Sequence, residues 1–364
     1  MREQSLEFLR ELMEAPSPSG FEQPAQSVVR SYVTDFSDEV DTDVMGNVIA
    51  SKNGKGKPRV MLAGHVDEIG LIVSYIDDKG YINFKGVGGW DTSVLVGQSV
   101  LVHTAEGPVP GVVGRKPIHL MSASERGKSI AIDQLFIDVG VEASEKNGKK
   151  NGKKSDSKTS KLVRIGDPVT VGNGFMPLQG DLVAGRCFDD KAGTFAIVEA
   201  LRLLARRKLD ASVFAVSTTQ EEVGLRGART SCFGLDPHVG IAVDVTFASD
   251  TPGDSKKKTS DVSIGGGPVI VRGANINPRL YERLIEAAEA KKIPYQLEAS
   301  PGGTGTDANA MQLTRSGVAT ALIGVPVRYM HTPVEVLSLK DLENTAKLLA
   351  ETIARLEEDS DFTP

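Results

Sequence analysis

Cysteine is nearly absent from this sequence: Cys187 and Cys232 are the two cysteines among 364 residues. Two cysteines cannot build a disulfide framework, which fits a reducing compartment and makes the cytoplasm the expected location. No stretch approaches the roughly 18 consecutive apolar residues of a transmembrane helix, so we expect no membrane partner. Residues 1–20 also lack the basic segment followed by an apolar segment that a signal peptide requires.

An excess of positive charge is missing as well. Lys and Arg number 42 and Asp and Glu number 48, so the net charge is 42 − 48 = −6. Phosphate-binding surfaces are usually basic, and we therefore expect no nucleic-acid partner. Hydrophobic residues make up 40% and charged residues 25%, the balance of an ordinary globular protein. At roughly 100–200 residues per domain, the length allows two domains with a sizeable core.

The apolar pattern changes twice along the chain. Residues 1–69 and 174–364 contain strand-like runs that alternate with amphipathic helices, which is typical of an α/β domain with a largely parallel sheet. Residues 70–173 contain short β-like runs at close spacing, separated by Gly, Pro, Asp and Asn, which predict a small β-barrel or sandwich. We therefore predict an α/β fold: a mixed, largely parallel sheet flanked by helices, with an inserted barrel-like β domain.

Local signals mark several element boundaries. Ser19 and Glu22 have the spacing of a capping box at the start of a helix, and Ser338 and Asp341 have the same spacing before the last helix. Residues 145–161 form a low-complexity, Lys-rich stretch. Its composition favours a solvated flexible loop over an anion-binding arm.

Histidine and acidic residues recur where strand-like runs end. Ligands of open α/β sheets bind outside the carboxyl ends of the strands, so side chains at these positions are candidates for one site. The residues at the ends of five runs are His65 with Asp67, the pair Asp189–Asp190, the pair Glu221–Glu222, Asp244, and His331. Each signal is weak alone, because acidic pairs commonly start helices or lie on the surface. Together they predict a cluster of buried acids, which is disfavoured without a compensating Arg or Lys unless a cation neutralises it.

The side-chain types in this set restrict the metal. Imidazoles and carboxylates without a thiolate suit Zn²⁺, Co²⁺ or Mn²⁺. Two histidines with at least three carboxylates exceed what one tetrahedral catalytic zinc needs. We therefore expect two divalent metal ions per subunit, which share a carboxylate and clamp one water at a separation of roughly 3.5–4 Å.

The stretches that contain these residues resemble the tetrahedral aminopeptidases, a family of glutamyl and deblocking aminopeptidases with co-catalytic zinc. The matching stretches are AGHVDEIG (63–70), CFDDKAG (187–193), QEEVGLRGA (220–228), AVDV (242–245), TGTDA (304–308) and MHTPVEV (330–336). The resemblance covers nearly the whole chain, including the position of the β-rich insert. Val66, Lys191 and Thr332 stand where relatives usually carry Met, Arg and Ser, and none of them is a ligand in the family pattern.

The resemblance implies a role for each metal-ligand candidate. Asp189 corresponds to the carboxylate that bridges the two metals. His65 and Asp244 would complete one metal site, and Glu222 and His331 would complete the other.

The resemblance also implies roles for two residues that do not bind metal, and an activity. Glu221 corresponds to the general base, and Asp67 would hydrogen-bond the imidazole of His65 and fix its orientation. The implied activity is the metal-dependent removal of N-terminal residues from short peptides, on a zinc exopeptidase-like fold. The implied assembly is a homo-oligomer, in which the β-rich insert forms dimers and the dimers build a hollow tetrahedral dodecamer.

Other functions stay open at this point. Related carboxypeptidases and deacylases use paired metals in the same way, and some relatives have been described as endoglucanases. A glycosidase needs two metal-free carboxyls about 5–10 Å apart, which fails if Glu222 is a ligand. Gly303, Gly305 and Ala308 have the spacing of a dinucleotide fingerprint, but Asp307 would repel a pyrophosphate. A non-catalytic binding protein is disfavoured, because the base and all the ligands are present.

Overall fold

The computed structural model describes residues 1–140 and 158–364, which form two compact units. The first unit consists of Met1–Glu68, Asn173–Met330 and Val334–Pro364, and the second of Ile69–Gly172 with His331–Pro333. Most of the Lys-rich stretch lies outside the described residues, so its interpretation as a solvated loop stays a prediction. Within the two described ranges, no helix is long and apolar enough to cross a membrane.

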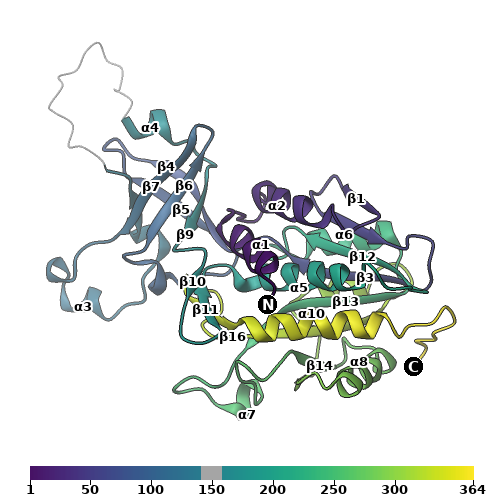
Figure 1. Ribbon diagram of the computed structural model, residues 1–364. Helices are drawn as coiled ribbons and strands as arrows, with labels where there is room; N and C mark the ends of the chain where they lie inside the picture. The colour runs from purple at the N-terminus through teal and green to yellow at the C-terminus, as the bar shows by residue number, and fades with distance from the viewer. Residues whose placement is uncertain (141–157) are drawn as a thin grey trace. The chain divides into compact units, whose positions relative to one another are not determined.

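An eight-stranded mixed sheet forms the main layer of the first unit (Figure 1). In spatial order its strands are β1 (Glu39–Thr42), β2 (Val48–Lys52), β12 (Ser212–Thr218), β3 (Arg59–His65), β13 (Val239–Phe247), β16 (Ala319–Val327), β14 (Val269–Gly273) and β15 (Gln296–Ser300). The neighbours β12, β3, β13 and β16 are parallel to one another, whereas β1, β2 and β14 each have an antiparallel neighbour. The prediction of a mixed, largely parallel sheet is confirmed.

The central strands are buried on both faces. In β3 and in β13, every residue except one at a strand end is buried. Strands covered by helices on both faces read as continuous apolar runs for this reason. Gly64 in β3 has no room for a side chain, because a Cβ there would lie 2.5 Å from the main-chain carbon of Gly193 in α5 (Phe188–Leu204). The sheet and this helix therefore meet backbone to backbone beside His65.

Helices cover the two faces of the sheet. α5 precedes β12, and α6 (Arg226–Leu235) connects β12 to β13. Because β12 and β13 lie on opposite sides of β3 and such crossovers are right-handed, α5 and α6 cover opposite faces. The helices that pack with α5 are α1 (Glu3–Glu14), α2 (Gln23–Val33) and α10 (Leu339–Ile353), and α8 (Pro278–Lys291) packs with α10. On the other face α9 (Asp307–Gln312) packs with α6. A short helix, α7 (Lys256–Thr259), lies between β13 and β14 in the chain.

The two predicted capping boxes have different outcomes. Ser338 caps α10, because its hydroxyl oxygen accepts hydrogen bonds from two amides of the first turn. The prediction for Ser19 and Glu22 is wrong: α2 begins at Gln23 without a side-chain cap. The Ser19 hydroxyl instead donates to the buried carboxylate of Asp67, at 2.7 Å. An ionised acceptor forms a stronger hydrogen bond than a neutral one, and the fold brings this one within reach.

A second, smaller sheet lies in the first unit. Its antiparallel strands are β10 (Met176–Pro177), β11 (Leu182–Gly185) and β17 (Glu335–Ser338). The run that precedes Asp189 was expected to be a strand of the main sheet, and this expectation is wrong. Asp189 therefore reaches its place from outside the main sheet.

The second unit is a closed six-stranded barrel. Its strands, in order around the barrel, are β4 (Gly70–Ile76), β5 (Ile82–Val87), β8 (Phe136–Asp138), β7 (Gly107–Gly114), β6 (Ser99–Thr104) and β9 (Pro168–Val171). Buried apolar side chains, among them Leu71, Phe84 and Ile137, fill it. Short helical segments connect the strands: η1 (Thr92–Leu95), η2 (Ile118–Leu120), α3 (Ala123–Arg126), η3 (Ile132–Gln134) and α4 (Lys158–Leu162). The predicted barrel-like insert is confirmed.

Candidate metal centre

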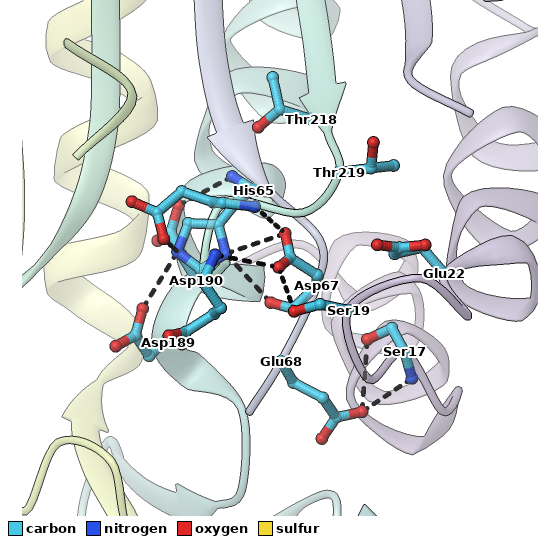
Figure 2. A network of polar contacts seen from close by, with 12 residues as sticks. Ser17, Ser19, Glu22, His65, Asp67, Glu68, Asp189, Asp190, Thr218 and Thr219 are labelled. Carbon is cyan, nitrogen blue, oxygen red and sulfur yellow. Dashed lines mark hydrogen bonds and ion pairs between the residues drawn. The ribbon is translucent and has the colours of Figure 1, made fainter. Parts of the chain in front are cut away.

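His65 is the last residue of β3, and its side chain is 2% exposed. Its Nε2 atom lies 3.2 Å from Oδ1 of Asp189 and 3.7 Å from Oε2 of Glu221. Oδ1 of Asp244 is 3.9 Å from the same nitrogen. Figure 2 shows the imidazole within a network of polar contacts that includes both Asp189 and Asp67. One ring nitrogen therefore faces three carboxylates from distant parts of the chain.

His65, Asp189 and Asp244 form a candidate metal-binding group. One ligand atom from each residue lies within 4.8 Å of the others, and all three residues are buried. Asp244 lies inside β13, which continues to Phe247, and Asp189 lies at the start of α5 with a non-helical φ of −79° and ψ of 104°. The expectation that both residues end strands of the main sheet is therefore wrong. The three residues converge all the same, because α5 packs directly on β3 and β13.

Asp67 contacts both His65 and the segment that carries the two glutamates. Its main-chain carbonyl oxygen lies 3.0 Å from Nδ1 of His65, and its carboxylate Oδ1 lies 3.6 Å from the same nitrogen. The carboxylate also accepts hydrogen bonds from the amides of Glu221, at 3.0 Å, and Glu222, at 3.2 Å. The shorter of the two contacts between Asp67 and the imidazole is thus the one from the main-chain carbonyl.

His331, the predicted ligand after β16, is grouped with the second unit. In that unit its Nδ1 lies 2.9 Å from the carbonyl oxygen of Gly89. If Nδ1 donates to this carbonyl, Nε2 is the nitrogen left for a metal. Glu222 is half-buried in the first unit. The assignment of Glu222 and His331 as ligands stays a prediction.

The charges at the centre are out of balance. Burial, followed by the neighbouring carboxylates of Asp244 and Asp307, raises the pKa of Glu221 to about 10, although His65 opposes the shift. Burial and Asp189 raise the pKa of Asp244 to about 8. Burial alone would lower the pKa of His65, but Glu221, Asp189 and Asp67 together raise it well above its usual value. One imidazolium is therefore too little positive charge to keep all these buried carboxylates ionised, and a bound cation would favour their ionised forms.

Two acids to which the sequence interpretation gave no role belong to the same cluster. Asp190 is fully buried and accepts hydrogen bonds from the main-chain amides of His65, at 3.2 Å, and Gly193, at 2.8 Å. Asp307 accepts a hydrogen bond of 2.6 Å from the hydroxyl of Thr218, and burial raises its pKa to about 6. Both acids lie in stretches that carried the resemblance, so the signal was present. The sequence interpretation named Asp190 as a neighbour of Asp189, and considered Asp307 as a charge that would repel a pyrophosphate.

A family model for M42 glutamyl aminopeptidases matches residues 46–348. The chain belongs to this family. A lysyl aminopeptidase of Pyrococcus furiosus is 39% identical to this M42 chain, over 98% of the chain and 99% of the relative. The resemblance to the tetrahedral aminopeptidases is confirmed.

Solved structures agree with this membership. The structure of a TET aminopeptidase from Thaumarchaeota archaeon SCGC AB-539-E09 matches this M42 chain with a TM-score of 0.89 and 36% identity, covering 97% of both chains. The TET1 peptidase of Pyrococcus horikoshii matches with a TM-score of 0.83 and 32% identity, over 97% of this chain and 100% of that one. The latter protein is described as assembling into a tetrahedron or a large octahedral shell.

In this M42 chain, two buried cations lie next to the acidic cluster but pair with another acid. Glu68 is 2.9 Å from Nε of Arg186 and 3.5 Å from Nζ of Lys191. Burial alone would raise the pKa of Glu68, but the two cations lower it to about 2. The two cations therefore compensate the charge of Glu68.

Proposed function

We propose that this M42 chain is a metal-dependent aminopeptidase that removes N-terminal residues from short peptides, with water activated by two divalent ions. The observation that carries the proposal is the group formed by His65, Asp189 and Asp244, whose ligand atoms lie within 4.8 Å of one another. Family membership supports an aminopeptidase over the related carboxypeptidases and deacylases. Zinc is the first candidate ion, followed by cobalt and manganese, because the donors are imidazole nitrogens and carboxylate oxygens.

The residues present fit such ions. Among the described residues, Oε1 of Glu221 and Oδ1 of Asp307 are buried without a hydrogen-bond partner, which is costly unless a ligand satisfies them. In the proposal His65 and Asp244 hold one ion, Glu222 and His331 hold the other, and Asp189 is shared. Bound there, the ions supply the Lewis acidity that makes water a nucleophile near neutral pH.

Glu221 is the proposed general base. The carboxylate of Glu221 lies beside the imidazole of His65. The main-chain amide of Glu221 donates a hydrogen bond to the carboxylate of Asp67. Glu221 would accept a proton from the attacking water and pass it to the departing amine of the peptide. Asp67 would hold His65 in place through its carbonyl and its carboxylate.

The assembly and location are further parts of the proposal. We infer a homo-oligomer in which the barrel unit forms dimers and the dimers build a tetrahedral dodecamer, supported by the shells described for the TET1 relative. A closed shell would admit short, unfolded peptides and exclude folded proteins. Light scattering after gel filtration measures the mass of the particle, which should be about twelve times the chain mass of 38.8 kDa. We place the enzyme in the cytoplasm.

One assay panel tests the activity. The protein is stripped with a chelator and then supplied with Zn²⁺, Co²⁺ or Mn²⁺, and aminoacyl-p-nitroanilides, N-acyl amino acids and cellulose are offered in parallel. The proposal expects hydrolysis of the p-nitroanilides alone, lost with the chelator and restored by at least one metal. Hydrolysis of N-acyl amino acids would indicate a deacylase instead. Cleavage of cellulose that survives the chelator would indicate a metal-free glycosidase.

A further inference from the structure

A short segment before α2 runs alongside the residues that follow β3. Pro18 pairs with Glu68 in an isolated parallel bridge. The amide of Glu68 donates to the carbonyl oxygen of Ser17 at 2.9 Å, and the amide of Ser17 donates to the carboxylate of Glu68 at 2.8 Å. Figure 2 shows Ser17 and Ser19 on the side of this strand end opposite Asp189. The segment is therefore fixed against Asp67 and Glu68 by its main chain.

The side chain of Ser19 extends this contact to Asp67. Its hydroxyl donates a hydrogen bond of 2.7 Å to Oδ2 of Asp67, and both residues are buried, at 8% and 0% exposure. The same carboxylate accepts the amides of Glu221 and Glu222, and the Asp67 carbonyl contacts His65. Asp67 therefore joins three separate segments, and Ser19 is the one side-chain donor among the hydrogen bonds described for its carboxylate.

We propose that Ser19 is a positioning residue: through Asp67, its hydroxyl holds the main chain of Glu221 and Glu222 in register with the imidazole of His65. The catalytic consequence rests on the proposed function, whereas the positioning itself does not. A carboxylate rotates freely about its side-chain bonds unless its oxygens are held, and here the Ser19 bond restrains Oδ2. Without it, Oδ2 of Asp67 would keep one described hydrogen-bond donor, the amide of Glu222, and the carboxylate would be held less firmly.

The expected loss of activity in a Ser19 variant can be estimated from residues that orient a metal ligand or a base without touching the metal. Losing a partner that orients a metal ligand or a base commonly costs 10–100-fold in activity or metal affinity. A misplacement of about 1 Å at a reacting group can cost on the order of 100-fold. We expect Ser19→Ala to lower kcat about 10-fold or more with little change in KM, because Ser19 acts through Asp67 on the proposed base Glu221.

Ser17 provides a matched control two residues away. Its hydroxyl is also buried, but it lies 3.3 Å from Glu68 and makes no described contact with Asp67. Ser17→Ala removes the same atom from the same segment and leaves the main-chain bond to Glu68 in place. Ser19→Thr keeps a hydroxyl and should behave as the wild type. Ser19→Cys replaces the hydroxyl by a slightly larger thiol, which is a weak donor, and should behave as Ser19→Ala.

The experiment has two readouts on the full-length protein. Hydrogen–deuterium exchange of residues 219–225, measured without metal, should be faster in Ser19→Ala and Ser19→Cys than in the wild type, Ser17→Ala or Ser19→Thr. The kcat values should follow the same order. Unchanged exchange in folded Ser19→Ala or Ser19→Cys overturns the positioning role. If the wild type hydrolyses no aminoacyl substrate, the proposed function fails, and the exchange result still decides the role of Ser19.

Discussion

Nε2 of His65, at the end of a strand of the main sheet, lies 3.2 Å from a carboxylate oxygen of Asp189, at the start of a helix. The two residues are brought together because α5 packs on β3 with no side chain between Gly64 and Gly193. A larger residue at position 64 would push the helix, and Asp189 with it, away from the imidazole. The geometry of the candidate centre therefore depends on close packing of main chain against main chain.

Replacement of the shared ligand should change the metal content most. Asp189→Asn is expected to lower the content from two ions per subunit to less than one, because the proposal assigns this carboxylate to both ions. Asp244→Asn should leave one ion. Metal analysis of dialysed protein by mass spectrometry measures the ratio, with Asp359→Asn on the exposed C-terminal segment as the control. Equal metal content in all four proteins would contradict the ligand assignment.

Replacement of the proposed base should separate catalysis from metal binding. Glu221→Gln is expected to lower kcat about 10²–10⁴-fold, the usual contribution of a general base, and to leave the metal content unchanged. Steady-state kinetics on an aminoacyl-p-nitroanilide, with metal analysis of the same sample, measures both quantities. The exposed Glu282→Gln on α8 is the matched control. Activity that survives in Glu221→Gln would remove this residue from the mechanism.

Breaking the buried ion pairs of Glu68 should destabilise the first unit. Glu68→Gln removes the carboxylate that pairs with Arg186 and Lys191 and leaves these cations with neutral hydrogen-bond partners. Removing one member of a buried ion pair typically costs about 3–5 kcal/mol. Urea unfolding at pH 7 measures the loss in the free energy of unfolding, with Glu358→Gln as an exposed control.

The pH dependence of this effect has a definite sign. The folded pKa of Glu68, about 2, is below its ordinary value of 4.5, so its ionised form stabilises the fold. This contribution is fully present above about pH 4.5 and is lost as the pH falls towards 2. The difference between wild type and Glu68→Gln should therefore shrink over that window. A difference that stays constant would mean that the carboxylate charge is not what stabilises the fold.

Glu22 should have the opposite effect on stability. It is 3% exposed, and burial, assisted by the nearby charge of Asp67, raises its pKa from 4.5 to about 7. The unfolded chain therefore loses this proton at lower pH than the folded chain, and stability falls as the pH rises from about 4.5 to 7. Glu22→Gln should remove this fall and make the protein more stable than the wild type at pH 8, with little difference at pH 4. Its amide oxygen can still accept the hydrogen bond from Gly20.

Thermal or urea unfolding across pH 4–8 measures this prediction. Parallel curves for wild type and Glu22→Gln over the whole range would show that Glu22 titrates normally in the folded protein.

The class of fold could be predicted because its signals are local. The buried strands β3 and β13 are continuous apolar runs, and the barrel is a series of short runs with turn residues between them. The hydroxyl of Ser19 illustrates the limit of such signals. Its spacing from Glu22 fits a helix cap, and the hydrogen bond it makes is to Asp67, which no local pattern contains.

The sequence by itself determined the fold class and the family and supplied the candidate metal ligands, because residue type, periodicity and motif spacing are properties of neighbouring residues. Only the tertiary structure decided that Asp190 and Asp307 belong to the acidic cluster. It also decided that Arg186 and Lys191 pair with Glu68. Asp189 lies at the start of a helix and not at the end of a strand of the main sheet. Which charges face each other depends on how distant elements pack, and each pairing depends on distances of a few ångströms that no stretch of sequence specifies alone.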